Sequence, residues 1–313
     1  PAPAPAPALD KYGGILKMGT YKEPTSFGWP LDIRVNNREH AMRCLQGQLR
    51  AGEGATIEPQ LATSWELSPD KKSYTFHLRK GVKFHDGTDF NAEAVKWNLD
   101  NILESTHPVL QGVTSVDVID DYTVRLNLSK WTNLILEDLA TANECFLVSP
   151  TAVEKNGVEW AKTHPIGTGP FKLKEYTRNV SVKYERFDEY WEEGLPYLDG
   201  VEYIIIKDPM TALASLKAGE IQLLLDLDIT GARELAPAGY YNIEWRPGVY
   251  DSFFFNSKDP DSPFSDKRVR QAVEYAIDKE AISEGLGGGY VPPFYQMIPG
   301  GPECPDKVIR KYD

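Results

Sequence analysis

The segment spanning residues 201–229 constrains the fold more strongly than any other part of the sequence. Its first seven residues, VEYIIIK, contain the apolar run YIII and predict a strand. Asp208 can cap a helix, Pro209 suits the first helical position, and Gly219 is a usual helix stop. A second apolar run, IQLLLDLDI, begins soon afterwards. Strand, helix and strand in this order predict a crossover unit and therefore the α/β fold class.

An earlier part of the chain shows a less regular alternation of strands and helices. In SYTFHLR, a period of two places three apolar side chains on one face of a strand: Tyr74, Phe76 and Leu78. Asn91 can cap the helix that follows, and one apolar stripe along that helix comprises Val95, Leu99, Ile102 and Leu103. Two more strands are expected on either side of a turn at Asp120 and Asp121. This region is therefore expected to form an α+β unit.

Glycine and proline mark a domain boundary in HPIGTGPFKLKEY, residues 164–176, because they interrupt the chain four times before the next strands. Farther along, Asp266 can cap a helix in SDKRVRQAVEYAIDKEAI. The apolar face of this helix comprises Val269, Ala272, Val273, Ala276 and Ile277. The final residues, rich in glycine and proline, show no closing element. The chain is therefore expected to end within a domain.

Charge and cysteine content exclude several classes of protein. The 313 residues include 46 acidic and 34 basic side chains, a formal net charge of -12 at pH 7. Such an excess of negative charge argues against a general attraction to nucleic acid or anionic lipid. No uninterrupted apolar run approaches the ~20 residues that a membrane helix needs. Cys44, Cys145 and Cys304 are too widely spaced for a zinc site or a dense disulfide framework, although one pair stays open.

Alternating prolines and alanines make up residues 1–8, PAPAPAPA. Because alternate prolines remove amide donors, this stretch cannot form a helix and is expected to be an extended tether. A spacer of this kind ahead of a folded body suits a protein that is exported and anchored. A disordered tail without that role has the same composition, so both interpretations stay open.

Motifs of the common enzyme classes are absent from the sequence. It contains no GxSxG, no GxxxxGK[ST] and no HExxH, and the glycines at 287–289 lack the setting of a dinucleotide site. His77, His85 and Asp86 would suit a zinc-dependent hydrolase if their side chains converged on one ion. Nothing in their spacing fixes them toward a common point, and we expect them on the polar faces of two strands. We therefore predict no catalytic residue, no cofactor and no metal site.

An aromatic run, VYDSFFFN, lies near residue 250. Tyr250, Phe253, Phe254 and Phe255 place aromatic groups on both faces of a strand. One face of such a strand can be core while the other lines a cleft, because binding pockets are mostly apolar with a few placed polar groups. Burial of all four side chains in a core is the alternative.

Long ordered blocks of the sequence resemble one known family. The block IEPQLATSWELSPDKKSYTFHLRKGVKFHDGTDFNAEAVKWNLD is similar to the signature segment of the extracytoplasmic peptide-binding receptors of ABC importers. Later blocks follow in the order of that family: PIGTGPFKLKEY, YWEEGLPYLDGVEYIIIKDPMTALASLKAGEIQLL, FFFNSKDPDSPFSDKRVRQAVEYAIDKEAI and GGGYVPPFYQMIPGG. The family is family 5 of the solute-binding proteins, which also includes nickel and oligosaccharide binders.

The resemblance implies a periplasmic-binding-protein-like clamshell of two lobes, with an additional α+β domain inserted in the first lobe. The first lobe is expected at residues 9–47 and 166–257, and the inserted domain at 48–165. Residues 258–313 are expected to begin a second lobe that the chain does not complete. Many such receptors are lipoproteins anchored outside the cell membrane through an N-terminal cysteine. That cysteine is not in this chain, so a lipid anchor is inferred from residues 1–8 alone.

The function that the resemblance implies is capture of a peptide by lobe closure and its delivery to the permease subunits of an ABC importer. The protein is expected to act as a monomer and to catalyse no reaction. A receptor of the same fold for an oligosaccharide or a nickel chelate is the alternative, and a metal-dependent hydrolase is the alternative from another class.

Six residues are the candidate ligand-binding positions. Tyr21 and Glu23 lie in the loop GTYKEP after the first expected strand, where Glu23 would receive a ligand cation or else be a solvated carboxylate. Asp226 follows the run EIQLLL. The other three come from the aromatic run, where the rings would pack on a ligand and the amide would donate a hydrogen bond: Tyr250, Phe253 and Asn256.

Overall fold

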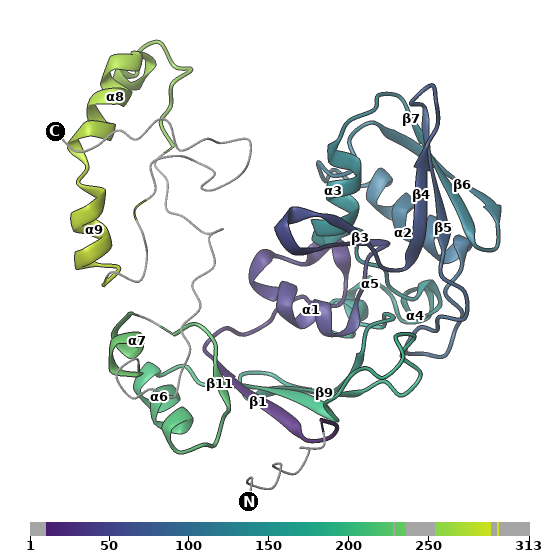
Figure 1. Cartoon of the computed structure of the whole chain (residues 1–313), viewed down its shortest axis with the longest axis horizontal. Coiled ribbons are helices and arrows are strands. Elements are labelled where there is room, and N and C mark those ends of the chain that lie inside the picture. The colour runs from purple at the N-terminus through teal and green to yellow at the C-terminus, as the bar shows by residue number, and fades with distance from the viewer. Residues whose placement is uncertain (1–10, 228, 236–253, 289–292, 294–313) are drawn as a thin grey trace, which may run out of the picture. The chain divides into compact units, whose positions relative to one another are not determined.

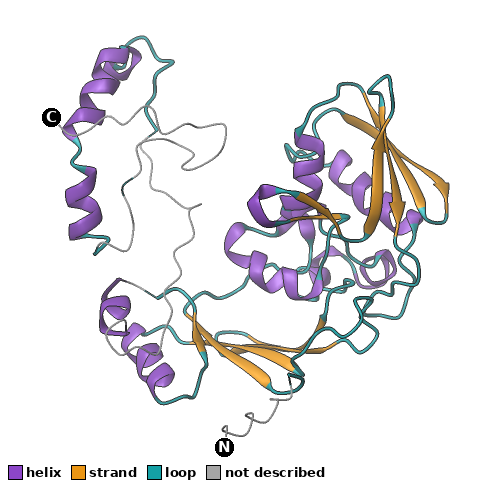
Figure 2. Ribbon diagram, in the orientation of Figure 1, coloured by secondary structure: helices purple, strands orange, loops and turns teal. Residues whose placement is uncertain are grey.

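The computed structural model describes residues 11–227, 229–235, 254–288 and 293. The chain divides into two compact units, residues 1–225 and residues 226–313, and each is described by itself (Figure 1). Tyr250 and Phe253, two of the predicted binding residues, lie outside the described residues. The first unit contains two large β-sheets, whose strands are shown in Figure 2.

A mixed five-stranded sheet joins the beginning and the end of the first unit. Its order is β11-β1-β10-β9-β8, and β1 runs parallel to both of its neighbours. The two remaining pairs, β10 with β9 and β9 with β8, are antiparallel. The strands are β1 (Ile15–Thr20), β8 (Phe171–Thr177), β9 (Ser181–Arg186), β10 (Gly200–Ile205) and β11 (Leu223–Leu224).

The crossover unit predicted from the sequence is confirmed. Helix α6 (Pro209–Lys217) leads from β10 to β11, and both strands run parallel to β1, which lies between them. The Asp208 carboxylate accepts a hydrogen bond from the Thr211 main-chain N–H at 2.8 Å and so caps the helix. Gly219 follows the helix with φ 75°, a left-handed conformation that glycine adopts without strain.

A second sheet, antiparallel and four-stranded, forms the α+β unit expected in the middle of the chain. Its order is β4-β5-β7-β6, and helix α2 lies against it (Figure 1). The Asn91 side chain caps α2 by accepting from the Ala94 N–H at 2.9 Å, as predicted. The elements are β4 (Ala62–Leu67), β5 (Ser73–Leu78), α2 (Ala92–Glu104), β6 (Val113–Asp120) and β7 (Thr123–Leu128).

The apolar faces predicted for this unit are confirmed by burial. On β5, the buried side chains are Tyr74, Phe76 and Leu78. On α2, Val95, Leu99 and Ile102 are buried and Leu103 is partly buried against the same core. Smaller elements complete the first unit: α1 (Arg38–Cys44), β2 (Leu49–Ala51), β3 (Ile57–Pro59), α3 (Leu134–Thr141), α4 (Pro150–Asn156) and α5 (Val158–Ala161).

Two hydrophobic cores lie in the first unit. One belongs to the four-stranded sheet and draws its residues from positions 49–147. The other belongs to the five-stranded sheet and also takes Phe146, Val148, Val153 and Ala161. These four residues fall within 48–165, the range predicted for the inserted domain. The domain boundaries therefore stay a prediction, and the cores divide the chain near residue 147.

The Gln46 side chain is the centre of a buried polar network. Its Oε1 accepts hydrogen bonds from Thr168 Oγ1 at 3.0 Å and from Trp191 Nε1 at 2.9 Å, and its Nε2 donates to Tyr190 Oη at 3.0 Å. The Arg79 guanidinium lies 4.1 Å from the centroid of the Trp191 ring. Through Trp191, the network connects Gln46 to Arg79, which follows β5. It also connects Gln46 to Thr168, which precedes β8.

Replacement of Gln46 by leucine is expected to lower the free energy of unfolding by about 2 kcal/mol, because the buried Thr168 hydroxyl and the partly buried Trp191 N–H lose their acceptor. Urea denaturation followed by tryptophan fluorescence measures the change. Gln111→Leu is the matched control, since Gln111 is exposed and makes one long contact with the Pro108 carbonyl. Equal stabilities of the two variants would contradict the assignment of Gln46 as a structural centre.

The second unit contains the helices α7 (Ile229–Leu235), α8 (Lys267–Ala276) and α9 (Lys279–Gly285). The predicted cap of α8 is confirmed, because the Asp266 carboxylate accepts from the Arg268 N–H at 2.8 Å. The apolar face of this helix is little covered within the described residues: Val269, Val273 and Ile277 are partly exposed, and Ala272 and Ala276 are exposed. The helix therefore forms from its local pattern without a complete packing partner among the described residues.

Candidate ligand-binding edge of the first sheet

The parallel strands β1, β10 and β11 end at one edge of the five-stranded sheet. Their last residues are Thr20, Ile205 and Leu224, and the registers Thr20 with Ile205 and Gly19 with Leu224 keep these ends level. Ligands of open α/β sheets bind outside the carboxyl ends of such strands. The loops that follow the three strands are therefore the candidate site, and we call this region the carboxyl edge.

Tyr21 is presented to solvent at the carboxyl edge. It follows β1 directly, its side chain is 52% exposed, and the Lys22 ammonium lies 5.5 Å from its ring centroid. The Lys22 main-chain N–H donates to Thr20 Oγ1 at 3.1 Å, which shapes the turn out of the strand. An exposed aromatic ring beside a cation can pack on an apolar group or accept a planar one.

Glu23 is held within the protein by both oxygens of its carboxylate. Oε1 accepts from the Tyr176 hydroxyl at 2.6 Å, and Oε2 accepts from the Asn179 N–H at 2.9 Å. The Tyr176 hydroxyl also lies 2.8 Å from the Pro24 carbonyl oxygen. Burial and the neighbouring Glu23 raise the pKa of Tyr176 above its ordinary value, so the phenol stays a donor at neutral pH. These contacts serve the loop itself, and reception of a ligand cation by Glu23 stays a prediction.

The remaining predicted positions belong to the second unit. Asp226 comes two residues after β11 and adopts φ 58°, a left-handed conformation that aspartate tolerates better than most residues. The Asn256 side chain is exposed, with Nδ2 3.5 Å from Asp259 Oδ2. In the aromatic run, Phe254 is 84% exposed, whereas the Phe255 ring stacks on Phe264 with centroids 4.4 Å apart. Of the aromatic run, the structure thus describes only Phe254, Phe255 and Asn256.

His77, His85 and Asp86 have separate surroundings. His77 is exposed on β5, whereas His85 Nε2 lies 2.9 Å from the Gly169 carbonyl oxygen. The Asp86 carboxylate accepts from the hydroxyls of Thr88 and Ser149, both at 2.6 Å. Among the described residues there is no group of three His, Cys, Asp or Glu that could hold a metal ion. The geometry gives no support to a metal-dependent hydrolase that uses these three residues.

Burial controls the protonation of His85. It lowers the pKa of the imidazole to about 4, although the Gly169 and Pro165 carbonyls act in the opposite direction. His85 is therefore neutral at pH 7. Its main-chain N–H also donates to the Gly167 carbonyl at 2.8 Å, and its ring packs edge-on against Phe187. The histidine fastens the segment 167–169, and it lies in a turn rather than on the polar face of a strand, where the sequence led us to expect it.

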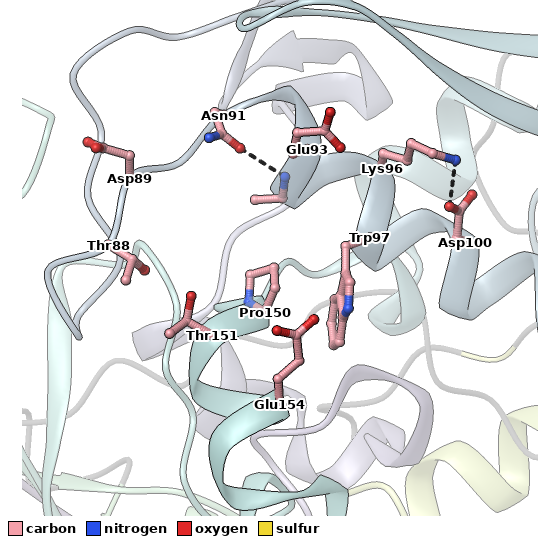
Figure 3. Close-up of a pocket in the computed structure, with 11 residues that line it drawn as sticks. Thr88, Asp89, Asn91, Glu93, Lys96, Trp97, Asp100, Pro150, Thr151 and Glu154 are labelled. Carbon is pink, nitrogen blue, oxygen red and sulfur yellow. Dashed lines mark hydrogen bonds and ion pairs between the residues drawn. The ribbon is translucent and has the colours of Figure 1, made fainter.

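A surface hollow of about 380 Å³ lies between α2 and α4 (Figure 3). Lys96 and Asp100 form an ion pair at 2.6 Å on its rim, and the Glu154 carboxylate lies beside the Trp97 ring. An aromatic face flanked by carboxylates suits a cationic group. Sequence reasoning did not single out this hollow, because it depends on two helices that are far apart in the sequence. Its lining comprises Thr88, Asp89, Asn91, Glu93, Ala94, Lys96, Trp97, Asp100, Pro150, Thr151 and Glu154.

No candidate for a membrane-spanning helix is found in the part of the chain that the structure describes. There, no helix combines the length and the apolar character that a membrane crossing requires.

Comparison with known proteins identifies the family. Residues 56–313 match the model of the bacterial extracellular solute-binding proteins, family 5 Middle. The glutathione-binding protein GsiB of Salmonella choleraesuis (strain SC-B67) is 31% identical over 259 residues, which are 81% of this chain and 50% of GsiB. The chain thus spans about half the length of the curated relatives it matches.

Solved structures of the same architecture are similar to this chain. The periplasmic binding protein AgaA of A. tumefaciens R10, solved with agropinic acid, is 30% identical with a TM-score of 0.76, covering 92% of this chain and 59% of AgaA. The oligopeptide-binding protein AppA of Bacillus subtilis, solved with a nonapeptide, is 26% identical with a TM-score of 0.76, covering 96% and 62%. The periplasmic-binding-protein-like fold predicted from the resemblance is confirmed. The chain belongs to the bacterial extracellular solute-binding proteins, family 5.

Proposed function

We propose that this chain is part of the substrate-binding receptor of an ABC importer and that the receptor captures peptides. The observation that carries the proposal is the family match over residues 56–313, together with relatives that bind glutathione and a nonapeptide. Both ligands contain peptide or peptide-like amide groups. Hydrogen bonds to such groups do not depend on the side chains, and bridging waters tolerate side-chain variety at small cost.

Domain closure is the proposed mechanism, and no bond is broken. In the complete protein, a ligand held by two lobes stabilises the closed state through contacts that the open state lacks. The permease subunits then recognise the closed state. We propose residues 9–47 and 166–257 as the first lobe, 48–165 as the inserted domain and 258–313 as the beginning of the second lobe.

The proposed ligand contacts of this chain lie at the carboxyl edge and in the aromatic run. Tyr21 supports the proposal best, because its ring is exposed directly after a parallel strand. Asp226 follows β11, and Asn256 offers an exposed amide. Tyr250 and Phe253 complete the proposed set from the sequence pattern alone.

Location and assembly follow from the same proposal. The family is extracellular, and we propose that residues 1–8 link the folded body to a lipid anchor at the outer face of the cell membrane. The receptor is proposed to act as a monomer and to contact permease subunits of the importer when it delivers its ligand.

A receptor for a non-peptide solute is the second candidate, because AgaA has this fold and was solved with agropinic acid. Native mass spectrometry of the longest natural form, purified without denaturant and then unfolded to release its ligand, separates the two candidates. A ladder of co-purified peptides supports the first, and a single non-peptide solute supports the second. Calorimetric titration with a panel of glutathione, a nonapeptide and agropinic acid then measures each affinity.

Tyr21→Ala is expected to weaken binding of the ligand that the panel identifies by about tenfold, because exposed aromatic rings at binding sites are frequent energetic hot spots. Tyr12→Ala is the matched control. Tyr12 has a similar exposure, 45%, but precedes β1 at the opposite end of the strand. Equal affinities of the two variants would place the ligand away from the carboxyl edge.

A further inference from the structure

A chain of hydrogen bonds connects three loops around the carboxyl edge. Glu23, in the loop after β1, accepts from Tyr176 at the end of β8 and from the Asn179 N–H in the turn between β8 and β9. The Asn179 side-chain oxygen accepts from Lys207 Nζ at 2.7 Å, and Lys207 lies in the loop after β10. The segments that meet are residues 21–25, 177–180 and 206–208.

The geometry of Asn179 depends on this connection. It adopts φ 59°, a left-handed conformation in which asparagine is enriched. In that conformation its N–H points at Glu23 Oε2 while its side chain reaches Lys207. A single turn residue thus bonds two other loops, one through its backbone and one through its side chain.

The Tyr176 side chain is held both by its ring and by its hydroxyl. Its ring packs edge-on against the buried Phe27, with centroids 5.5 Å apart. Its hydroxyl lies within hydrogen-bond distance of both Glu23 and the Pro24 carbonyl. Hydrogen bonds to an ionised carboxylate are stronger than neutral ones. The loop after β1 is therefore fastened to β8 by one charge-assisted hydrogen bond, and the packing of the Tyr176 ring on Phe27 holds its donor in place.

We propose that Glu23 is a positioning residue that fastens residues 21–25 to the turn at 177–180. The two segments then open and close as one unit. Tyr21 is thereby held in the position in which it contacts the ligand. The inference deepens the proposed function and rests on it for the role of Tyr21. A loop that is ordered before binding loses less conformational entropy when the ligand arrives. Glu23 thereby contributes to affinity through Tyr21, whereas direct contact with a ligand cation, the role predicted from the sequence, would add a loss of its own.

Amide hydrogen exchange tests the fastening without any ligand. Glu23→Gln keeps the shape of the side chain, but an amide cannot accept from both donors equally well. Exchange is expected to become about tenfold faster in residues 21–25 and in 177–180 together. Tyr176→Phe, which removes only the hydroxyl, is the second variant and is expected to accelerate exchange in residues 21–25.

Glu175→Gln is the matched control for exchange. Glu175 is the neighbour of Tyr176 on β8, and its carboxylate accepts from Thr177 Oγ1 and Lys183 Nζ, both at 2.9 Å. Its substitution is expected to leave exchange in residues 21–25 unchanged. Unchanged exchange in the Glu23→Gln protein, or faster exchange in only one of the two segments, would overturn the proposal.

A double-mutant cycle separates positioning from general stability. Glu23→Gln, Tyr21→Ala and the double variant are titrated with glutathione, or with the panel member that binds the unmodified protein. Glu23→Gln alone is expected to weaken binding about tenfold and to have no further effect when Tyr21 is already alanine. Additive losses would show that Glu23 does not act through Tyr21 and would overturn that role. If the natural form releases no solute in mass spectrometry and no panel member binds the unmodified protein, the proposed function fails, and the exchange result alone decides the fastening.

Discussion

Replacement of Gly167 by alanine is expected to destabilise the first unit by about 3 kcal/mol or more, the largest effect of any single substitution considered. A Cβ atom at this position would lie 2.2 Å from the Cys44 carbonyl oxygen and 2.9 Å from Leu45 Cα. Both are backbone atoms that cannot rotate away. Gly169, two residues on, donates its N–H to the same Cys44 carbonyl at 2.8 Å. The clash would therefore disturb the contact between residues 43–45 and 167–169.

Urea denaturation of the purified chain, followed by near-UV circular dichroism, measures this loss. Gly285→Ala is the control, because a Cβ atom at Gly285 meets no atom within 4 Å. That substitution at the end of α9 is expected to be neutral or slightly stabilising, since alanine favours helix. A Gly167→Ala protein as stable as the control would show that the close approach of the two segments is absent in solution.

Acidification from pH 7 to pH 5 is expected to lower the free energy of unfolding of the first unit by about 4 kcal/mol, about 2 kcal/mol for each of His40 and His85. Burial lowers the pKa of both imidazoles from 6.5 to about 4, with Arg43 adding to the effect at His40. Between pH 6.5 and pH 4 the unfolded chain therefore binds more protons than the folded one. Stability rises with pH through this window and is lost as the pH falls.

Other titrating groups change the free energy of unfolding at other pH values or with the opposite sign. Burial raises the pKa of Asp138, so its protonation stabilises the fold and offsets part of the loss at the acid end. The Asp117 carboxyl, whose pKa is lowered by hydrogen bonds from Arg125 and Asn127, contributes stability that is lost only at more acidic pH. The window from pH 7 to pH 5 therefore reports mainly on the two buried histidines.

Urea denaturation at a series of pH values in that window measures the slope. Combined His40→Gln and His85→Gln substitutions are expected to remove most of it, whatever their effect on stability at pH 7. His77→Gln is the matched control, because that side chain is exposed on β5. A double variant with the slope of the unmodified protein would refute the assignment to these histidines.

Local signals were sufficient to predict several elements from the sequence. Asp208 with Pro209 and Gly219 bounds α6, and Asn91 starts α2, because caps and stops act over a few residues. The alternation in β5 predicted its buried face for the same reason. The crossover from β10 to β11 followed from the order of these local elements.

Non-local contacts limited the rest of the prediction. The role of Glu23 depends on Tyr176 and Asn179, which are more than 150 residues away in the sequence. A solvated carboxylate and a fastening carboxylate look alike in the motif GTYKEP. The hollow beside Trp97 and the residues that join the second core between 146 and 161 likewise depend on which helices pack together. Spacing alone carries no information on such contacts.

The pairing of β1 has a consequence for the order of folding during synthesis. Ile15 lies opposite Gly200 in β10, so β1 can pair with β10 only after almost the whole first unit has been synthesised. The four-stranded sheet, by contrast, draws all its strands from residues 62–128 and can close while later residues are still being translated. Non-local pairs form slowly because the intervening chain must first be closed into a loop. The amino-terminal strand β1 is thus synthesised first and joins its sheet late. Its edges need protection from other strands until residue 205, the end of β10, has left the ribosome.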